Sequence, residues 1–354
     1  MRGGGLLRKL NQNELADADN KRMQSKRFWM VITYIVTVML LCTLFLVSVN
    51  IGSLKVSFSE LFSGLFVAYD SNVATIYDLR FPRIIISMLA GAAVAVSGVL
   101  FQAVLKNPLA DPGIIGISSG AGLAAVCVTA LAPSLYFFTP VVACVGGVIA
   151  FLLVYILSWK GGLSPLRIIL IGIAVDALFT GLSSVVNSMS GGDRTGVASI
   201  VEGNITQKTW ADVRTLLPYV VVGMLLALLS VRKCNLLALE DKTARSLGVN
   251  VNQTRIGISV IAVILASIST AVVGAISFLG LIVPHIGRLL VGSDHKKLIP
   301  FSALAGAVTF LLADTIGRTI ARPYEVAAPV VMSVIGGPFF LVLLKRKHKE
   351  GLEV

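Results

Sequence analysis

Long apolar blocks are the feature that most constrains this sequence, because a helix of about 20 apolar residues spans the hydrocarbon core of a bilayer. Hydrophobic residues make up 56% of the 354-residue chain and charged residues only 14%, whereas a typical soluble domain is about 25% charged. We therefore predict an all-α polytopic membrane protein with about ten transmembrane helices. The predicted spans are residues 28–49, 82–104, 114–132, 139–159, 167–190, 213–231, 256–276, 277–290, 301–321 and 326–344.

The distribution of Lys and Arg predicts how these spans are oriented. Of the 30 basic residues, 22 fall in segments on the side that contains both termini and 8 fall on the other side. In membrane proteins the cytoplasmic segments carry the excess of Lys and Arg. We therefore expect a protein of the cytoplasmic membrane with both termini in the cytoplasm. This topology also accounts for most of the net charge of +12 without a nucleic-acid partner.

The same pattern divides the chain into three parts. Residues 1–27 are expected to form a basic cytoplasmic segment, 28–344 a transmembrane domain with a cytoplasmic loop at 235–250, which we call the coupling loop, and 345–354 a basic cytoplasmic tail.

No pattern of catalytic or metal-binding residues accompanies the spans. The histidines His285, His295 and His348 fit no metal-binding spacing, and the four cysteines form no CxxC pair. A P-loop is also missing from the sequence. We therefore expect a chain that is not an enzyme and holds no cofactor or metal, and any energy from ATP and Mg²⁺ would have to arrive through another chain.

The loop between the sixth and seventh spans carries its own apolar pattern. Leu236, Leu239, Ala244 and Leu247 can share one face of one or two short helices, and Gly248 fits a C-cap. One interpretation is a solvated connector on the headgroups. The alternative is a docking knob for a cytoplasmic partner that drives transport.

Two polar, helix-breaking segments interrupt the apolar chain. Asn107-Pro108 and Pro112-Gly113 follow the second span, and residues 191–209 lie on the opposite face of the membrane. Irregular backbone at membrane depth is tolerated where protein or water satisfies it. Pathway or gating residues are therefore expected among Asn107, Pro108, Ser199 and Glu202, with plain turns as the alternative.

Two carboxylates lie within apolar spans, where they should face protein or water. Asp314 is interpreted as a structural hydrogen-bonding partner within the bundle rather than a proton relay. Asp176 is predicted to face the pathway, against a cationic group of the substrate.

Several ordered motifs resemble the permeases of iron-siderophore, heme and vitamin B12 ATP-binding-cassette importers, the type II importers. The resemblance covers residues 75 to 345. It rests on Leu79-Arg80-Phe81-Pro82-Arg83, Gly98-Val99-Leu100-Phe101-Gln102, Asn107-Pro108-Leu109-Ala110-Asp111-Pro112-Gly113, Leu237-Ala238-Leu239 with Ala244-Arg245-Ser246-Leu247-Gly248, Phe278 to Arg288, Leu312-Ala313-Asp314 with Arg318, and Gly336-Gly337-Pro338.

The resemblance implies partners and roles for named residues. Two permease subunits would pair around a pathway, with two copies of a cytoplasmic ATPase and an extracytoplasmic substrate-binding protein. Arg80, Arg83 and Arg318 would look outward and dock that binding protein, with ordinary headgroup anchoring as the alternative. The residues implied in coupling to the ATPase are Leu236, Leu239, Asp241, Ala244, Arg245, Leu247 and Gly248.

The sequence departs from the family pattern at three places. Glu240 stands where the coupling loop usually has Gly, Ile200 stands near a usual Trp, and Glu325-Val326-Ala327-Ala328-Pro329 replaces Glu-x-Pro-x-Gly. Such drift favours a heterodimeric pair, although a homodimer stays open.

The expected function is translocation of an iron(III)-siderophore driven by a separate ATPase. Heme or cobalamin import is the alternative within the class. An ion-coupled secondary transporter using Asp176 and Asp314 is a less favoured alternative from another class.

Overall fold

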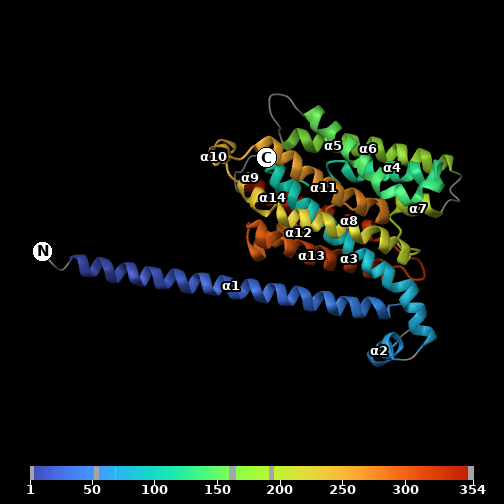
Figure 1. The fold of residues 1–354 in the computed structure, drawn as a ribbon, viewed down its shortest axis with the longest axis horizontal. Coiled ribbons are helices and arrows are strands. Elements are labelled where there is room, and N and C mark those ends of the chain that lie inside the picture. Colours follow the sequence, from blue (N-terminus) through green and yellow to red (C-terminus); the bar gives the residue numbers. More distant parts are fainter. Residues whose placement is uncertain (1–3, 52–55, 68, 159–164, 191–194, 350–354) are drawn as a thin grey trace.

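The protein is described by a computed structural model, which covers residues 4–51, 56–67, 69–158, 165–190 and 195–349. Within these ranges every regular element is a helix (Figure 1). The helices are α1 (Gly4–Asn50), α2 (Phe58–Phe66), α3 (Ser71–Leu105), α4 (Ile117–Leu131), the 3₁₀ helix η1 (Pro133–Phe138), α5 (Thr139–Ser158), α6 (Pro165–Met189), α7 (Thr195–Glu202), α8 (Trp210–Leu229), α9 (Val231–Leu237), α10 (Asp241–Ser246), α11 (Val251–Val273), α12 (Leu279–Val291), α13 (His295–Ile320) and α14 (Ala328–Lys349).

Each predicted span corresponds to one apolar helix, which confirms the all-α membrane fold. In the described part of the chain, seven helices are long and apolar enough to cross a membrane, and the apolar segments 117–131, 279–291 and 328–343 are shorter. The predicted division between the spans 256–276 and 277–290 is also present, because the chain turns between α11 and α12. Gly274 and Phe278 flank this turn with positive φ angles of 77° and 65°.

Two helices begin well before the predicted spans. The helix α1 runs without a break through the predicted boundary at residue 27, because no proline interrupts that segment. The helix α3 begins 11 residues before the predicted start at Pro82, which lies inside the helix. The motif Leu79 to Arg83 is therefore helical and does not form a loop before the span.

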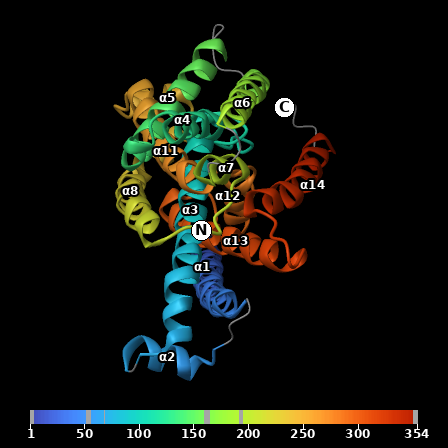
Figure 2. The same ribbon diagram turned by 90° about the vertical axis from the view of Figure 1, so that its right-hand side faces the viewer.

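The core of the bundle is built around α3, α11 and α13. In the most apolar window of α3, 78% of the residues are buried, whereas the corresponding value for α1 is 6%. Viewed along the long axis, α3 and α12 lie near the middle, with α1, α5, α6, α8 and α14 around them (Figure 2). The outer helices therefore present apolar side chains away from the protein, as lipid contact requires.

Small residues allow the central helices to approach closely. A Cβ atom on Gly98 of α3 would collide with the carbonyl of Gly280 in α12, and one on Gly91 would collide with the carbonyl of Gly306 in α13. Because lipid is as apolar as the helix surfaces, such backbone contact is a main source of helix association in a bilayer.

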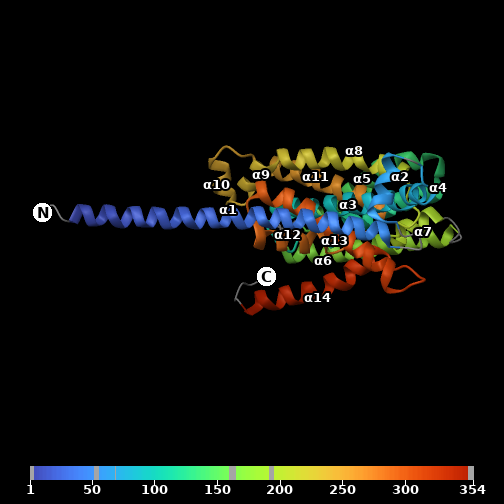
Figure 3. The same ribbon diagram turned by 90° about the horizontal axis from the view of Figure 1, so that it is seen from below.

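The ends of the bundle differ in what they carry. The helix α10, the start of α1 and the end of α14 lie at one end, and α7 lies at the other (Figures 1 and 3). We call them the α10 end and the α7 end.

The contact between α3 and α12 predicts that a side chain added at one glycine will strongly lower the stability of the protein. Gly98→Val should destabilise the protein by about 1–3 kcal/mol or prevent its folding, because the new side chain meets backbone that cannot move aside. Gly257→Val is the matched control, since a Cβ there meets open space. The melting temperature of the detergent-purified variants measures the difference. Equal shifts for both variants would contradict the proposed contact.

Candidate functional sites at the two ends of the bundle

The coupling loop forms the two short helices that the sequence predicts, α9 and α10. The end of α10 is closed by a Schellman motif, in which the N–H of Gly248 bonds to the carbonyl of Arg245 (2.9 Å) and that of Val249 to the carbonyl of Ala244 (3.1 Å). Gly248 adopts φ = 81°, a left-handed conformation that suits glycine. The sequence pattern therefore predicted this helix end correctly.

The apolar face of the loop divides between the bundle and the solvent. Leu247 is 60% exposed and Leu239 is 39% exposed, whereas Ala244 is only 1% exposed. Arg245 is exposed and Leu236 is half-buried. Ala244 therefore packs α10 against the bundle and does not lie on its exposed face. The role of Ala244 in coupling stays a prediction.

Asp241 lies at the start of α10 and binds two cations from other helices. Its Oδ1 accepts a hydrogen bond from Nζ of Lys106 (2.8 Å) and one from Nη2 of Arg255 (3.0 Å). Nζ of Lys106 also donates to the carbonyl of Leu239 (2.5 Å). The hydrogen bond from Lys106 is the main reason that the pKa of Asp241 lies below its usual value. Asp241 therefore faces the bundle and joins α10 to the ends of α3 and α11.

The predicted break at Asn107–Gly113 is a buried loop between α3 and α4. Asn107 is 8% exposed and its Oδ1 accepts from the N–H of Leu109 (3.0 Å). Pro108 is half-buried. The loop folds back against α12, because Nε2 of Gln102 donates both to the carbonyl of Ala110 (3.1 Å) and to that of Gly280 (3.0 Å).

Asp111 is a residue of this loop to which the sequence reasoning gave no role. It is fully buried, and its Oδ1 accepts hydrogen bonds from the N–H groups of Gly113 (2.8 Å) and Ile114 (3.2 Å). Its Oδ2 lies against Gly280, in the first turn of α12. The sequence signal that could have identified Asp111 is an acidic residue inside a helix-breaking segment.

A buried ion-pair network occupies the α7 end, and Asp314 lies at its centre. Oδ1 of Asp314 lies 2.8 Å from Nη2 of Arg83, and Oδ2 lies 3.3 Å from Nε of Arg318. Nη1 of Arg83 also contacts Oε2 of Glu325 (2.8 Å). The network joins α3 to α13, which confirms the interpretation of Asp314 as a structural partner.

Two of the three arginines expected to look outward are buried. Arg83 is 6% exposed and Arg318 is 7% exposed. Both are paired within the chain, Arg83 with Asp314 and Glu325 and Arg318 with Asp314, so neither side chain points freely outward. Their role in docking a binding protein stays a prediction. Arg80 is half-buried and donates to the carbonyl of Val49 (2.5 Å).

Glu325, from the segment that departs from the family pattern, completes this network. Its Oε2 also accepts from Oγ1 of Thr206 (2.9 Å), so it links the segment before α14 to the segment before α8. Burial is the largest single influence on the pKa of Glu325 and raises it, but the hydrogen bonds from Arg83 and Thr206 and the charges of Arg83 and Arg318 together outweigh burial, so this pKa lies below its usual value.

The remaining predicted pathway residues are spread along the bundle. Glu202 is exposed at the end of α7. Ser199 lies in the same helix, and its side chain is outside the described part of the chain. Asp176 of α6 is half-buried and hydrogen-bonds to the side chain of Ser119 in α4. The structure therefore places Asp176 at the start of α4, apart from the network that contains Asp314.

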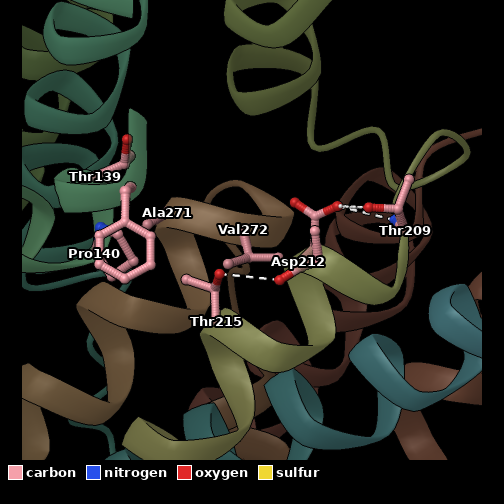
Figure 4. Close-up of a pocket in the computed structure, with 9 residues that line it drawn as sticks. Thr139, Pro140, Thr209, Asp212, Thr215, Ala271 and Val272 are labelled. Carbon is pink, nitrogen blue, oxygen red and sulfur yellow. Dashed lines mark hydrogen bonds between the residues drawn. The ribbon is translucent and has the colours of Figure 1, made fainter. Parts of the chain in front are cut away.

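A cavity of about 390 Å³ lies between the ends of α5, α8 and α11 and contains none of the predicted site residues. Figure 4 shows Asp212 beside it, with a carboxylate oxygen that accepts from the N–H of Thr209 (2.8 Å). The cavity lining is formed by Phe137, Thr139, Pro140, Thr209, Ala211, Asp212, Thr215, Ala271 and Val272.

These features define a polytopic helical membrane protein with a small exposed helix pair at one end and a buried charge network at the other. Residues 39–346 match the model of the FecCD transport family. The IsdF proteins of Staphylococcus aureus strains bovine RF122 / ET3-1 and Newman, named as heme-iron transport system permease proteins, are each 39% identical over 298 residues, which is 84% of this chain and 90% of theirs.

Solved structures agree with this assignment. A structure described as an inward-facing conformation of a metal-chelate type ABC transporter matches 89% of this chain and 99% of its own, with a TM-score of 0.74 and 27% identity. PsaBC from Streptococcus pneumoniae in complex with Fab shares the fold over 81% of this chain and 95% of its own, with a TM-score of 0.57 and 19% identity. The chain belongs to the FecCD transport family. It is a membrane transport permease of an ABC importer, and the resemblance found in the motifs is confirmed.

The network at the α7 end predicts unequal roles for its two carboxylates. Asp314→Asn should cost about 3–5 kcal/mol of unfolding free energy, because Arg83 and Arg318 would stay buried without their shared counter-charge. Glu325→Gln should cost about 1 kcal/mol or less, since the side chain of Glu325 is 38% exposed. Denaturant titration of the two purified variants measures the difference, and an equal loss would contradict the central position of Asp314.

Proposed function

We propose that this permease pairs with a second permease subunit and two copies of a cytoplasmic ATPase, and moves an iron chelate inward from an extracytoplasmic binding protein. The observation that carries the proposal is the helix pair α9 and α10. It exposes Leu239, Leu247 and Arg245 at one end of the bundle. An apolar contact beside a basic side chain fits a protein partner.

The proposed orientation places the α10 end in the cytoplasm of the cell. The α10 end carries the segments with the excess of Lys and Arg, and such segments stay cytoplasmic. Both termini would then be cytoplasmic. The binding protein would approach the α7 end, where Glu202 is exposed and Arg80 is half-buried.

The proposed substrate is an iron(III)-siderophore, with heme as a second candidate. The names of the IsdF relatives, which are 39% identical to this chain, support heme as the second candidate. A heterodimer is favoured over a homodimer because of the departures at Glu240 and at residues 325–329. ATP and Mg²⁺ would bind the ATPase partner.

The first test of the proposal concerns the ATPase contact. Leu247→Asp should reduce the amount of ATPase that co-purifies with the permease by about tenfold or more, because a charge replaces an apolar side chain at the centre of the contact. Leu135→Asp is the matched control, since Leu135 is also exposed (48%) but lies in η1 before α5. Retention of the ATPase at the wild-type level by Leu247→Asp would remove α10 as the docking element.

The second test concerns energy source and substrate. The complete transporter in proteoliposomes, supplied with its binding protein, should accumulate an iron chelate when ATP is present and should continue when the membrane potential is collapsed. Parallel assays with radiolabelled iron(III)-siderophore and with heme decide between the two substrates. Uptake that stops with the potential and ignores ATP would instead support a secondary transporter.

A further inference from the structure

We propose that the Lys106–Asp241 pair transmits the movement of α10 to the break between α3 and α4, so that both are positioning residues for transport. The inference deepens the proposed function and rests on α10 being the element that receives the ATPase. Asp241 would then act through the bundle and not through contact with the ATPase.

The attachment of α10 to the bundle is small. Among its six residues only Ala244 is buried, so one methyl group packs α10 against the bundle. This contact fixes the position of α10 far better than the orientation of the helix. The polar contacts of Asp241 supply the missing constraint. Lys106 hydrogen-bonds to Asp241 and to the carbonyl of Leu239, so it contacts the coupling loop on both sides of Glu240.

The backbone of Lys106 makes it a suitable point for this transmission. Lys106 ends α3 in a left-handed conformation with φ = 50°, which is unusual for a residue other than glycine. It is followed directly by the buried loop that begins at Asn107 and packs through Asp111 against Gly280 of α12. A displacement of Lys106 therefore acts on the starts of both α4 and α12.

The solvent exposure of these ion pairs distinguishes a role in transmitting movement from a role in stabilising the fold. The side chains of Lys106, Asp241 and Arg255 are 32%, 38% and 26% exposed. Ion pairs with this much solvent contact add little to the stability of a fold. A charge change at Lys106 is therefore expected to leave the folded bundle intact while it alters how α10 is held.

The experiment uses the complete transporter with its ATPase and binding protein in proteoliposomes. Lys106→Glu should retain the ATPase and its hydrolysis but lower substrate uptake per ATP hydrolysed about two- to thirtyfold, the range expected when a residue that couples two sites is changed. Lys106→Arg should keep the wild-type ratio, because the charge and the donor remain. Lys296→Glu is the control, since Lys296 is exposed at the start of α13 at the same end of the bundle.

The outcomes distinguish the inference from the function on which it rests. A wild-type ratio in Lys106→Glu, or an equal fall in Lys296→Glu, would overturn the transmitting role. Loss of the ATPase from Lys106→Glu would also overturn it, because the pair would then only shape the docking surface. If Lys106→Glu fails to fold, Lys106→Gln gives the same comparison without repulsion. Failure of the wild-type chain to retain an ATPase would reject the proposed function itself.

Discussion

Close backbone contact between α3 and the helices α12 and α13 is the constraint on which the rest of this structure depends. In a bilayer, helices gain nothing by hiding apolar side chains from lipid, so association depends on packing and on polar contacts. Gly98 against Gly280 and Gly91 against Gly306 bring backbones together where no Cβ could fit. This contact fixes the start of α12 beside the C-terminal part of α3. The buried loop that contains Asp111 can then close over the α12 terminus.

The charged groups at the two ends of the bundle follow different physical rules. At the α7 end, Arg83, Arg318 and Asp314 are withdrawn from solvent, so the loss of one member leaves an uncompensated charge. At the α10 end, Lys106 and Asp241 remain in contact with solvent, so their pair contributes little to stability. A rigid network at the α7 end and an adjustable pair at the α10 end would suit the proposed function, in which the protein receives motion at the α10 end.

Two interrupted segments of the chain meet inside the bundle. The loop before α4 and the turn before α12 meet where Gly113 approaches Ile276, and Gln102 binds both sides of the junction. Irregular backbone at this depth is satisfied by the protein itself. Lys106 lies next to this junction and binds the coupling loop, so a movement of the coupling loop would act directly on the junction.

The sequence by itself determined the class, the spans and the short coupling helices, because the length of an apolar run and a Gly after a helix are local properties. It also identified Asp314 as a partner within the bundle. Only the tertiary structure decided which groups meet. Arg83 and Asp314 are 231 residues apart in the chain, and burial of that pair turned two expected surface arginines into internal ones. The inward orientation of Ala244 and the partners of Asp241 and Asp111 were decided in the same way. Such contacts depend on how whole helices pack, and no local pattern in the sequence records that packing.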